Sequence, residues 1–104
     1  MKIKVCGITR PQDARLACKL GAWAVGLVFA PESPRRLSVP DARLLRAEIG
    51  AGALAVGVFQ NAPRAEILAA VSACRLDAVQ FHGEESPADC AGYEVPVFKA
   101  FSVA

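Results

Sequence analysis

Five short apolar segments, separated by longer segments with helical spacing, constrain the fold of this chain more than any other feature. Each segment is rich in Val, Phe or Ile, is too short for a helix and is bounded by Gly, Pro or polar residues, which is typical of a β-strand. Most are apolar at successive positions, and this favours strands that are covered on both faces. The predicted strands are residues 3–6, 23–29, 53–59, 78–81 and 95–101.

The segments between these strands predict helices. Apolar residues recur at helical spacing in residues 11–20, 40–49 and 64–74, and a shorter pattern covers residues 86–91. A proline near the start and a glycine just after the end mark the first two. Strands that alternate with helices in this way predict a parallel α/β sheet with right-handed crossovers.

An internal repeat and the lack of a linker indicate one domain over residues 1–104. The sequence Ala-Val-Gly-Leu-Val-Phe at 24–29 is echoed by Ala-Val-Gly-Val-Phe at 55–59. The interval of roughly 30 residues is the length of one βα unit. No low-complexity segment interrupts the series.

Charge, hydropathy and cysteine spacing exclude several classes of function. A formal charge of +2 without a clustered basic stripe argues against nucleic-acid binding. The longest apolar stretches fall short of the roughly 20 residues of a membrane span, and no secretory signal is visible, so we expect a cytoplasmic protein without a membrane partner. The four cysteines form no C-x-x-C pair and accompany a single histidine, which predicts reduced thiols and no metal or cofactor: Cys6, Cys18, Cys74 and Cys90.

Polar side chains gather where the predicted strands end. Because ligand sites of parallel α/β proteins form outside the carboxyl ends of the strands, this edge predicts a small-molecule site. The residues concerned are Cys6, 33–36, Gln60, Asn61, 80–84 and Lys99.

Several motifs in order resemble the phosphoribosylanthranilate isomerase family of tryptophan biosynthesis. They are Lys-Val-Cys-Gly-Ile-Thr at 4–9, Gly-Leu-Val-Phe at 26–29 leading into Ser-Pro-Arg-Arg at 33–36, Val-Gly-Val-Phe at 56–59, Asp-Ala-Val-Gln-Phe-His-Gly-Glu at 77–84 and Lys-Ala-Phe at 99–101. The resemblance implies a (βα)8 TIM barrel, of which this chain supplies the first four βα units and strand five.

The same resemblance implies an Amadori rearrangement, in which N-(5-phosphoribosyl)anthranilate becomes a carboxyphenylamino-deoxyribulose phosphate without a cofactor. A general acid opens the sugar ring and a general base, here Cys6, removes a proton from C2. The family's acid, an aspartate on strand six, and its phosphate-binding loops lie outside this sequence. We therefore expect an N-terminal half that has no meaningful isomerase activity when isolated.

Strand alternation gives a physical argument for Cys6. Lys4 and Cys6 share one face and are predicted to look into the barrel, while Ile3 and Val5 face the helices. A thiol acts as a base only when it is ionised, and the ammonium of Lys4, about 7 Å along the strand, would support the thiolate. From the residues alone a buried, unreactive thiol is the commoner role, and the motif favours catalysis.

The resemblance assigns substrate binding to three further residues. Arg35 matches the position that binds the anthranilate carboxylate, a role that suits a two-pronged guanidinium, although adjacent arginines in a Ser-Pro loop are otherwise simply solvated. Gln80 and His82 end the fourth strand and are expected to contact substrate. His82 would bind or orient the sugar or the anthranilate portion, and a purely structural role stays open. Asp77 precedes its strand and is predicted to be a cap or turn residue.

Three other interpretations remain from the sequence. The chain could be another phosphate-handling (βα)8 enzyme such as indole-glycerol-phosphate synthase, whose lysine and glutamate motifs it lacks. It could be a flavodoxin-like module, which would want an acidic cluster after the first strand. It could also be a non-enzymatic half-barrel, because an open parallel sheet exposes an edge strand that invites a homodimer or association with a missing C-terminal half.

Overall fold

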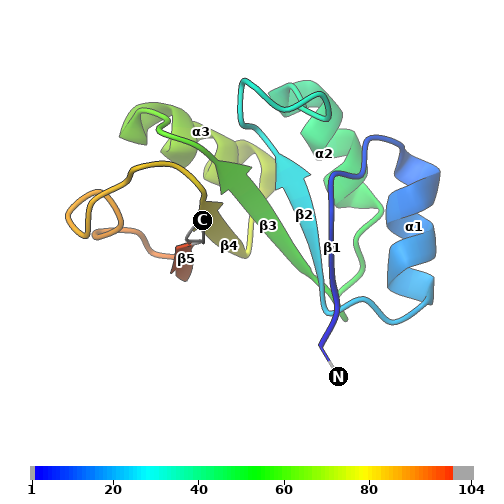
Figure 1. The fold of residues 1–104 in the computed structure, drawn as a ribbon. Helices are drawn as coiled ribbons and strands as arrows, with labels where there is room; N and C mark the ends of the chain where they lie inside the picture. The colour runs from blue at the N-terminus through cyan, green and yellow to red at the C-terminus, as the bar shows by residue number, and fades with distance from the viewer. Residues whose placement is uncertain (1, 100–104) are drawn as a thin grey trace, which may run out of the picture.

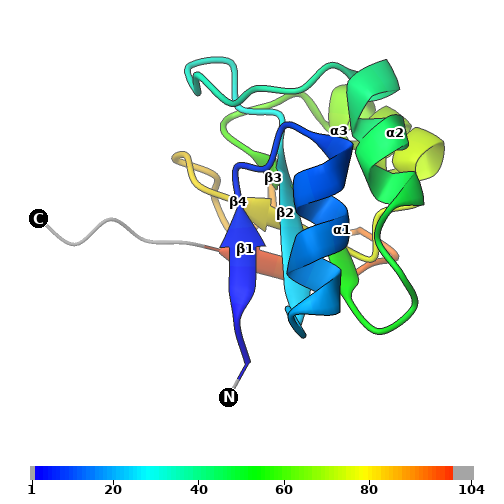
Figure 2. The ribbon, with the colours of Figure 1, turned by 90° about the vertical axis from the view of Figure 1, so that its right-hand side faces the viewer.

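The computed structural model describes residues 2–99 as a five-stranded parallel sheet covered by three helices (Figure 1). The strands run in the consecutive order β1-β2-β3-β4-β5. The helices α1, α2 and α3 all lie on one face of the sheet (Figure 2). The elements are β1 (Lys4–Cys6), α1 (Pro11–Lys19), β2 (Ala24–Val28), α2 (Val39–Ala47), β3 (Leu54–Phe59), α3 (Arg64–Cys74), β4 (Ala78–Phe81) and β5 (Val97–Lys99).

The consecutive strand order decides between two of the predicted architectures. A flavodoxin-like module would have the order 2-1-3-4-5, whereas each strand here pairs with its sequence neighbour. That order is the one expected for a (βα)8 barrel. The flavodoxin-like alternative is therefore wrong.

The uncovered face of the sheet curls inward. In a flat sheet β1 and β4 would lie roughly 14 Å apart, since neighbouring strands are separated by about 4.8 Å. Nevertheless, Lys4 on β1 donates a hydrogen bond to Gln80 on β4. The side chains on this face can meet across the intervening strands only because the sheet curves, and the uncovered face is thus the concave one.

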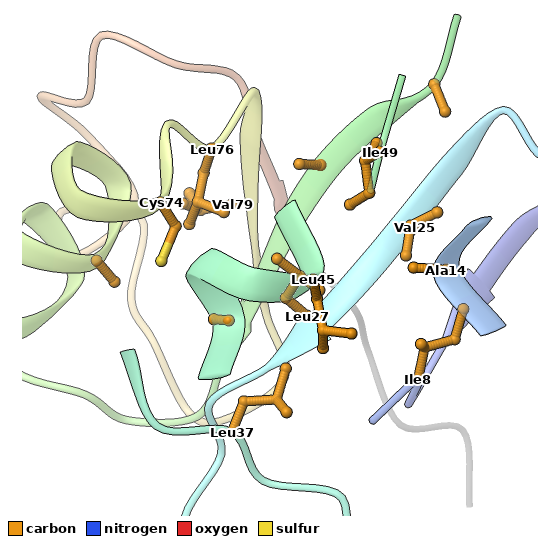
Figure 3. Packing of buried hydrophobic residues seen from close by; sticks show 14 of the residues in the cluster. Ile8, Ala14, Val25, Leu27, Leu37, Leu45, Ile49, Cys74, Leu76 and Val79 are labelled. Atoms are coloured by element: carbon orange, nitrogen blue, oxygen red, sulfur yellow. The ribbon is translucent and has the colours of Figure 1, made fainter. Parts of the chain in front are cut away.

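The main core lies between the sheet and the helices (Figure 3). Side chains at alternate strand positions, such as Leu27 and Val79, are fully buried against helix residues such as Leu45. Burying a side chain of this size contributes about 1.5–3 kcal/mol. The concave face carries smaller apolar clusters, one of which contains Ala24, Val56 and Ala78.

The helix boundaries follow local chemistry. α1 begins with a proline at its first position, where an amide hydrogen would have no partner. α2 starts one residue before the predicted boundary because the Ser38 hydroxyl caps it, accepting a hydrogen bond from the Asp41 amide at 3.2 Å. α3 ends where Arg75 adopts a left-handed conformation with φ of 50°.

Two sequence predictions need correction after β4. Residues 86–91 do not form a helix but a hydrogen-bonded turn, in which Ser86 and Asp89 bond each other's amides at 2.9 and 3.2 Å. Gly92 then adopts a φ of 85°, which a helix does not allow. The segment between β4 and Gly92 is therefore too short to offset the free-energy cost of helix nucleation. The fifth strand begins at Val97, not at 95, and residues 100–101 of the prediction lie outside the described residues.

Within residues 2–99, no helix is both long enough and apolar enough to cross a membrane. The same part of the chain contains no group of three or more His, Cys, Asp or Glu side chains placed to hold a metal ion.

Candidate active site

The thiol of Cys6 ends β1 on the concave face and depends on a glycine beside it. Cys6 pairs with Gly26 on β2, and a Cβ placed on Gly26 would lie 2.4 Å from the Cys6 Sγ. The missing side chain therefore creates the space that the sulfur occupies. Cys6 is exposed, whereas Cys74, the thiol that packs in the helix-side core, is buried. The position of Cys6 thus leaves its thiol accessible to a ligand.

The guanidinium arm of Arg35 lies across the residue that follows Cys6. A Cβ placed on Gly7 would approach the Arg35 Cδ to 2.6 Å and its Nε to 3.3 Å, and Gly7 has a φ of 81° that favours glycine. The Ser33 hydroxyl holds the loop by accepting a hydrogen bond from the Arg35 amide at 3.1 Å. Arg35 has no ion-pair partner within the part of the chain that the structure describes.

Both residues are therefore placed at the carboxyl end of β1: the Cys6 thiol lies on the concave face, and the Arg35 side chain reaches Gly7, the next residue, where it also lines a pocket with Val5 and α1. This juxtaposition joins a potential base to a bidentate carboxylate-binding group. Sequence reasoning proposed Cys6 and Arg35 as site residues but did not anticipate Gly7 and Gly26, whose missing side chains make room for them. A glycine in the interior of a strand was the available signal for Gly26, because it weakens the strand unless something approaches closely.

A second group of polar side chains crosses the concave face. Lys4 on β1 donates a hydrogen bond to Gln80 Oε1 on β4, and Gln80 Nε2 contacts His82 Nε2. Lys4 from the first predicted strand and Gln80 and His82 from the end of the fourth thus form one connected chain. The ammonium of Lys4 shares a face with Cys6, but its hydrogen-bond partner is Gln80.

Behind this edge, a network ties together the loops that follow β3 and β4. Asn61, with a left-handed φ of 51°, accepts a hydrogen bond from the Glu84 amide at 2.8 Å, and Glu85 accepts one from the Asn61 amide at 2.7 Å. Lys99 pairs with Glu85 at 2.7 Å and also bonds the Gly83 carbonyl. No helix follows Glu84 and Glu85, because residues 86–91 form a turn.

The electrostatics of Glu85 follow from this network. Burial acts to raise the pKa of the Glu85 carboxyl, whose side chain is 7% exposed. The hydrogen bond from Lys99, the backbone amides and the charge of Lys99 act in the opposite direction and prevail, so the pKa lies below its ordinary value. Glu85 is consequently an ionised structural residue that supports the loop, and not a proton donor.

Asp77 has the structural role predicted for it at the opposite end of the sheet. Its carboxylate accepts a hydrogen bond from the Ala55 amide at 2.8 Å, and its own amide donates to the Ala55 carbonyl at 2.8 Å. Arg46 lies 3.7 Å from the same carboxylate. These contacts join β4 to β3 at the amino end of the sheet, away from Cys6 and Arg35.

The sequence matches one family over nearly its entire length. The model of the family described as N-(5'phosphoribosyl)anthranilate (PRA) isomerase covers residues 3–104. The N-(5'-phosphoribosyl)anthranilate isomerase of Pseudomonas putida (strain W619) is 47% identical over 103 residues, which are 99% of this chain and 50% of that protein. The corresponding protein of Stutzerimonas stutzeri (strain A1501) is 48% identical over the same shares. The chain spans about half the length of the curated relatives it matches.

Solved structures agree with this match. The phosphoribosyl anthranilate isomerase of Thermus thermophilus gives a TM-score of 0.93 at 44% identity and covers 99% of this chain, which spans 52% of that structure. A phosphoribosyl anthranilate isomerase in complex with reduced 1-(o-carboxyphenylamino)-1-deoxyribulose 5-phosphate gives 0.95 at 40% identity, with 100% and 55% covered. The expected partial (βα)8 barrel is thereby confirmed, and the indole-glycerol-phosphate synthase alternative falls away. With sequence and fold in agreement along its length, the chain belongs to the N-(5'-phosphoribosyl)anthranilate isomerase family.

Proposed function

We propose that this chain supplies the general base and the carboxylate-binding group of an isomerase in tryptophan biosynthesis. The reaction is the Amadori rearrangement of N-(5'-phosphoribosyl)anthranilate to 1-(o-carboxyphenylamino)-1-deoxyribulose 5-phosphate. One observation carries the proposal: the Cys6 thiol fills the space over Gly26 while the Arg35 side chain crosses the adjacent Gly7. The proposed base is thus Cys6 itself, and the proposed anion-binding group reaches Gly7, the residue that follows it at the carboxyl end of β1.

In this proposal Cys6 acts on C2 of the sugar. Protonation of the ring oxygen by a general acid breaks its bond to C1 and leaves an iminium between C1 and the anthranilate nitrogen. The Cys6 thiolate then accepts the proton from C2, and the electrons of that C–H bond form the C1–C2 double bond of an enolamine, while the iminium electrons return to nitrogen. Tautomerisation of the enolamine to the C2 ketone completes the rearrangement. No step requires a cofactor.

Arg35 orients the substrate for that proton transfer. A guanidinium can bind both oxygens of the anthranilate carboxylate, which fixes the plane of the ring as well as its position. Its lack of an ion-pair partner among residues 2–99 leaves both donor edges available. Gln80 and His82 add hydrogen-bonding groups for the sugar or the anthranilate portion on the concave face that carries Cys6.

The proposed partners follow from the fact that this chain spans about half the length of its relatives. The general acid and the phosphate-binding loops would come from the second half of a (βα)8 barrel, in the same chain, in a separate one or through a second copy. A dimeric relative from Thermotoga maritima is known. We propose a cytoplasmic setting, where four free thiols stay reduced. A phosphorylated small molecule is the proposed ligand, without nucleic acid or membrane.

Replacing the thiol tests the proposed base. In an intact barrel that carries residues 1–104, Cys6→Ser should lower kcat for N-(5'-phosphoribosyl)anthranilate by about 10²–10⁴-fold, because a hydroxyl is a far weaker base. KM should stay similar, since binding relies on other groups. Cys18→Ser, on the helix side of the molecule, is the matched control and should leave kcat unchanged. Near-normal turnover by the Cys6→Ser variant would overturn the assignment.

The isolated chain provides a second test. Without the acid and the phosphate loops of the other half, we expect no isomerisation above the uncatalysed rate when the purified 104-residue chain is mixed with substrate. The loss of substrate fluorescence gives the measurement. Turnover by this chain would show that it supplies its own acid and would contradict the division of roles between two halves.

A further inference from the structure

The chain of Lys4, Gln80 and His82 has only one consistent arrangement of donors and acceptors. A lysine ammonium carries three donors and no acceptor, so the atom of Gln80 that faces it must be the carbonyl oxygen. The structure places Gln80 Oε1 there. The orientation of the side-chain amide, which is otherwise free to turn over, is thus decided by the charge on β1.

The orientation of the Gln80 amide determines which group it presents to the imidazole of His82. With its oxygen directed at Lys4, Gln80 presents its NH2 group to His82 Nε2. An NH2 group only donates, and Nε2 must therefore hold a lone pair. An imidazolium, or a neutral ring protonated on Nε2, would direct a second N–H at the amide and lose the hydrogen bond.

We infer that Lys4 and Gln80 fix the tautomer of the neutral His82 ring, with its proton on Nδ1. In water, neutral histidine carries the proton mainly on Nε2, so the contact reverses the ordinary preference. Which ring nitrogen is protonated is set by the bond that the other one makes. Lys4 is in this sense a positioning residue, because it acts on substrate through Gln80 and the ring.

The resulting group is a fixed hydrogen-bond donor. His82 is exposed, and its Nδ1 makes no hydrogen bond to any side chain or backbone atom among residues 2–99. An Nδ1–H of fixed orientation can donate to a substrate oxygen without first reorganising, which is how preorganised donors stabilise developing charge. Only this last role rests on the proposed function; the tautomer itself is a property of the folded chain.

A direct measurement is available because the chain has a single histidine. In ¹⁵N-labelled protein at about pH 8, where an unperturbed imidazole of pKa about 6.5 is neutral, long-range ¹H–¹⁵N correlation spectra separate the two ring nitrogens. We expect Nε2 to resonate far downfield as an unprotonated nitrogen and Nδ1 to resonate upfield as a protonated one. The reverse pattern in the unmodified chain would overturn the inference.

Variants test the direction of the effect. Gln80→Glu replaces the NH2 donor with an acceptor-only carboxylate, so the proton should move to Nε2 and the two resonances should exchange places. Lys4→Met removes the charge that orients the amide, and the downfield signal should shift away from Nε2 toward the ordinary mixture. Lys2→Met is the matched control, since Lys2 lies over the Trp23 ring outside the network, and it should leave the spectrum unchanged.

The outcomes distinguish this inference from the proposed isomerase function. Backbone amide spectra show whether each variant is folded, and the tautomer measurement needs no turnover. An unchanged His82 pattern in folded Lys4→Met protein would refute the role of Lys4, whatever the activity. A correct tautomer in a protein whose Cys6→Ser variant stays fully active would instead refute the catalytic base and leave the tautomer assignment intact.

Discussion

Gly26→Ala should displace the Cys6 thiol while leaving most of the fold in place. The added methyl carbon would lie 2.4 Å from the Cys6 Sγ and 3.3 Å from its Cβ, whereas ordinary contact begins near 3.4 Å. The sulfur must therefore move by about 1 Å or rotate away, because the paired strands leave the backbone little freedom. Overpacking of this kind costs typically 1–3 kcal/mol, and we expect the lower part of that range since the exposed thiol can rotate.

The functional loss should exceed the stability loss. A misplacement of about 1 Å at a reacting group can cost on the order of 10²-fold in rate. Urea unfolding measures the stability, and kcat in an intact barrel that carries residues 1–104 measures the function. Gly52→Ala is the matched control, because a Cβ there meets nothing within 4 Å.

A double-mutant cycle identifies the cause. In a Cys6→Ala background the sulfur is gone, so Gly26→Ala should cost less free energy of unfolding than it does in the unmodified chain. An equal cost in both backgrounds would mean that the methyl group clashes with something other than the thiol. That result would refute the interpretation that the missing side chain of Gly26 provides the space for the Cys6 sulfur.

Two further predictions concern charged residues. Arg35→Ala should raise KM roughly 10- to 100-fold with little change in kcat, because a charge-assisted hydrogen bond contributes about 1.5–3 kcal/mol. Arg36→Ala is the control, and an unchanged KM in the Arg35→Ala variant would count against carboxylate binding. Glu85→Gln should destabilise the fold by about 1–2 kcal/mol in urea unfolding near pH 7, as Lys99 loses its ionic partner. Folding lowers the pKa of Glu85 from its ordinary 4.5. The stabilisation from the ionised carboxylate is therefore complete above pH 4.5 and disappears as the pH falls through the folded pKa, so the variant and the parent should be equally stable in acid. An equal difference in the free energy of unfolding at all pH values would contradict this.

The sequence predicts the element order because the signals for strands and helices are local. Runs of Val, Phe and Ile and the punctuation by Gly and Pro are visible without knowledge of the fold, and consecutive parallel pairing follows from the alternation. The weakest local signal failed: residues 86–91 carry a capping pair, Ser86 and Asp89, which closes a turn as well as it starts a helix.

The candidate site shows the same difference between local signals, which the sequence reveals, and long-range contacts, which it does not. Cys6 and Arg35 could be proposed as site residues because motifs and strand ends mark them. The contacts that position them could not, since they join residues distant in sequence: Gly26 beneath the sulfur and Gly7 beneath the arginine. Likewise, strand alternation placed Lys4 on the face of Cys6, but only the curvature of the sheet brings its ammonium to Gln80, 76 positions away.

Alkylation of the thiols with iodoacetamide, followed by mass spectrometry, tests most directly whether Cys6 and Arg35 belong to one substrate site. The probe is reduced 1-(o-carboxyphenylamino)-1-deoxyribulose 5-phosphate, which a related isomerase binds, added to an intact barrel that carries residues 1–104. We expect the compound to slow modification of Cys6 but not of Cys18 or Cys90, and Arg35→Ala to weaken that protection. If calorimetry shows the compound bound while Cys6 reacts at its original rate, the thiol and the guanidinium do not share a ligand.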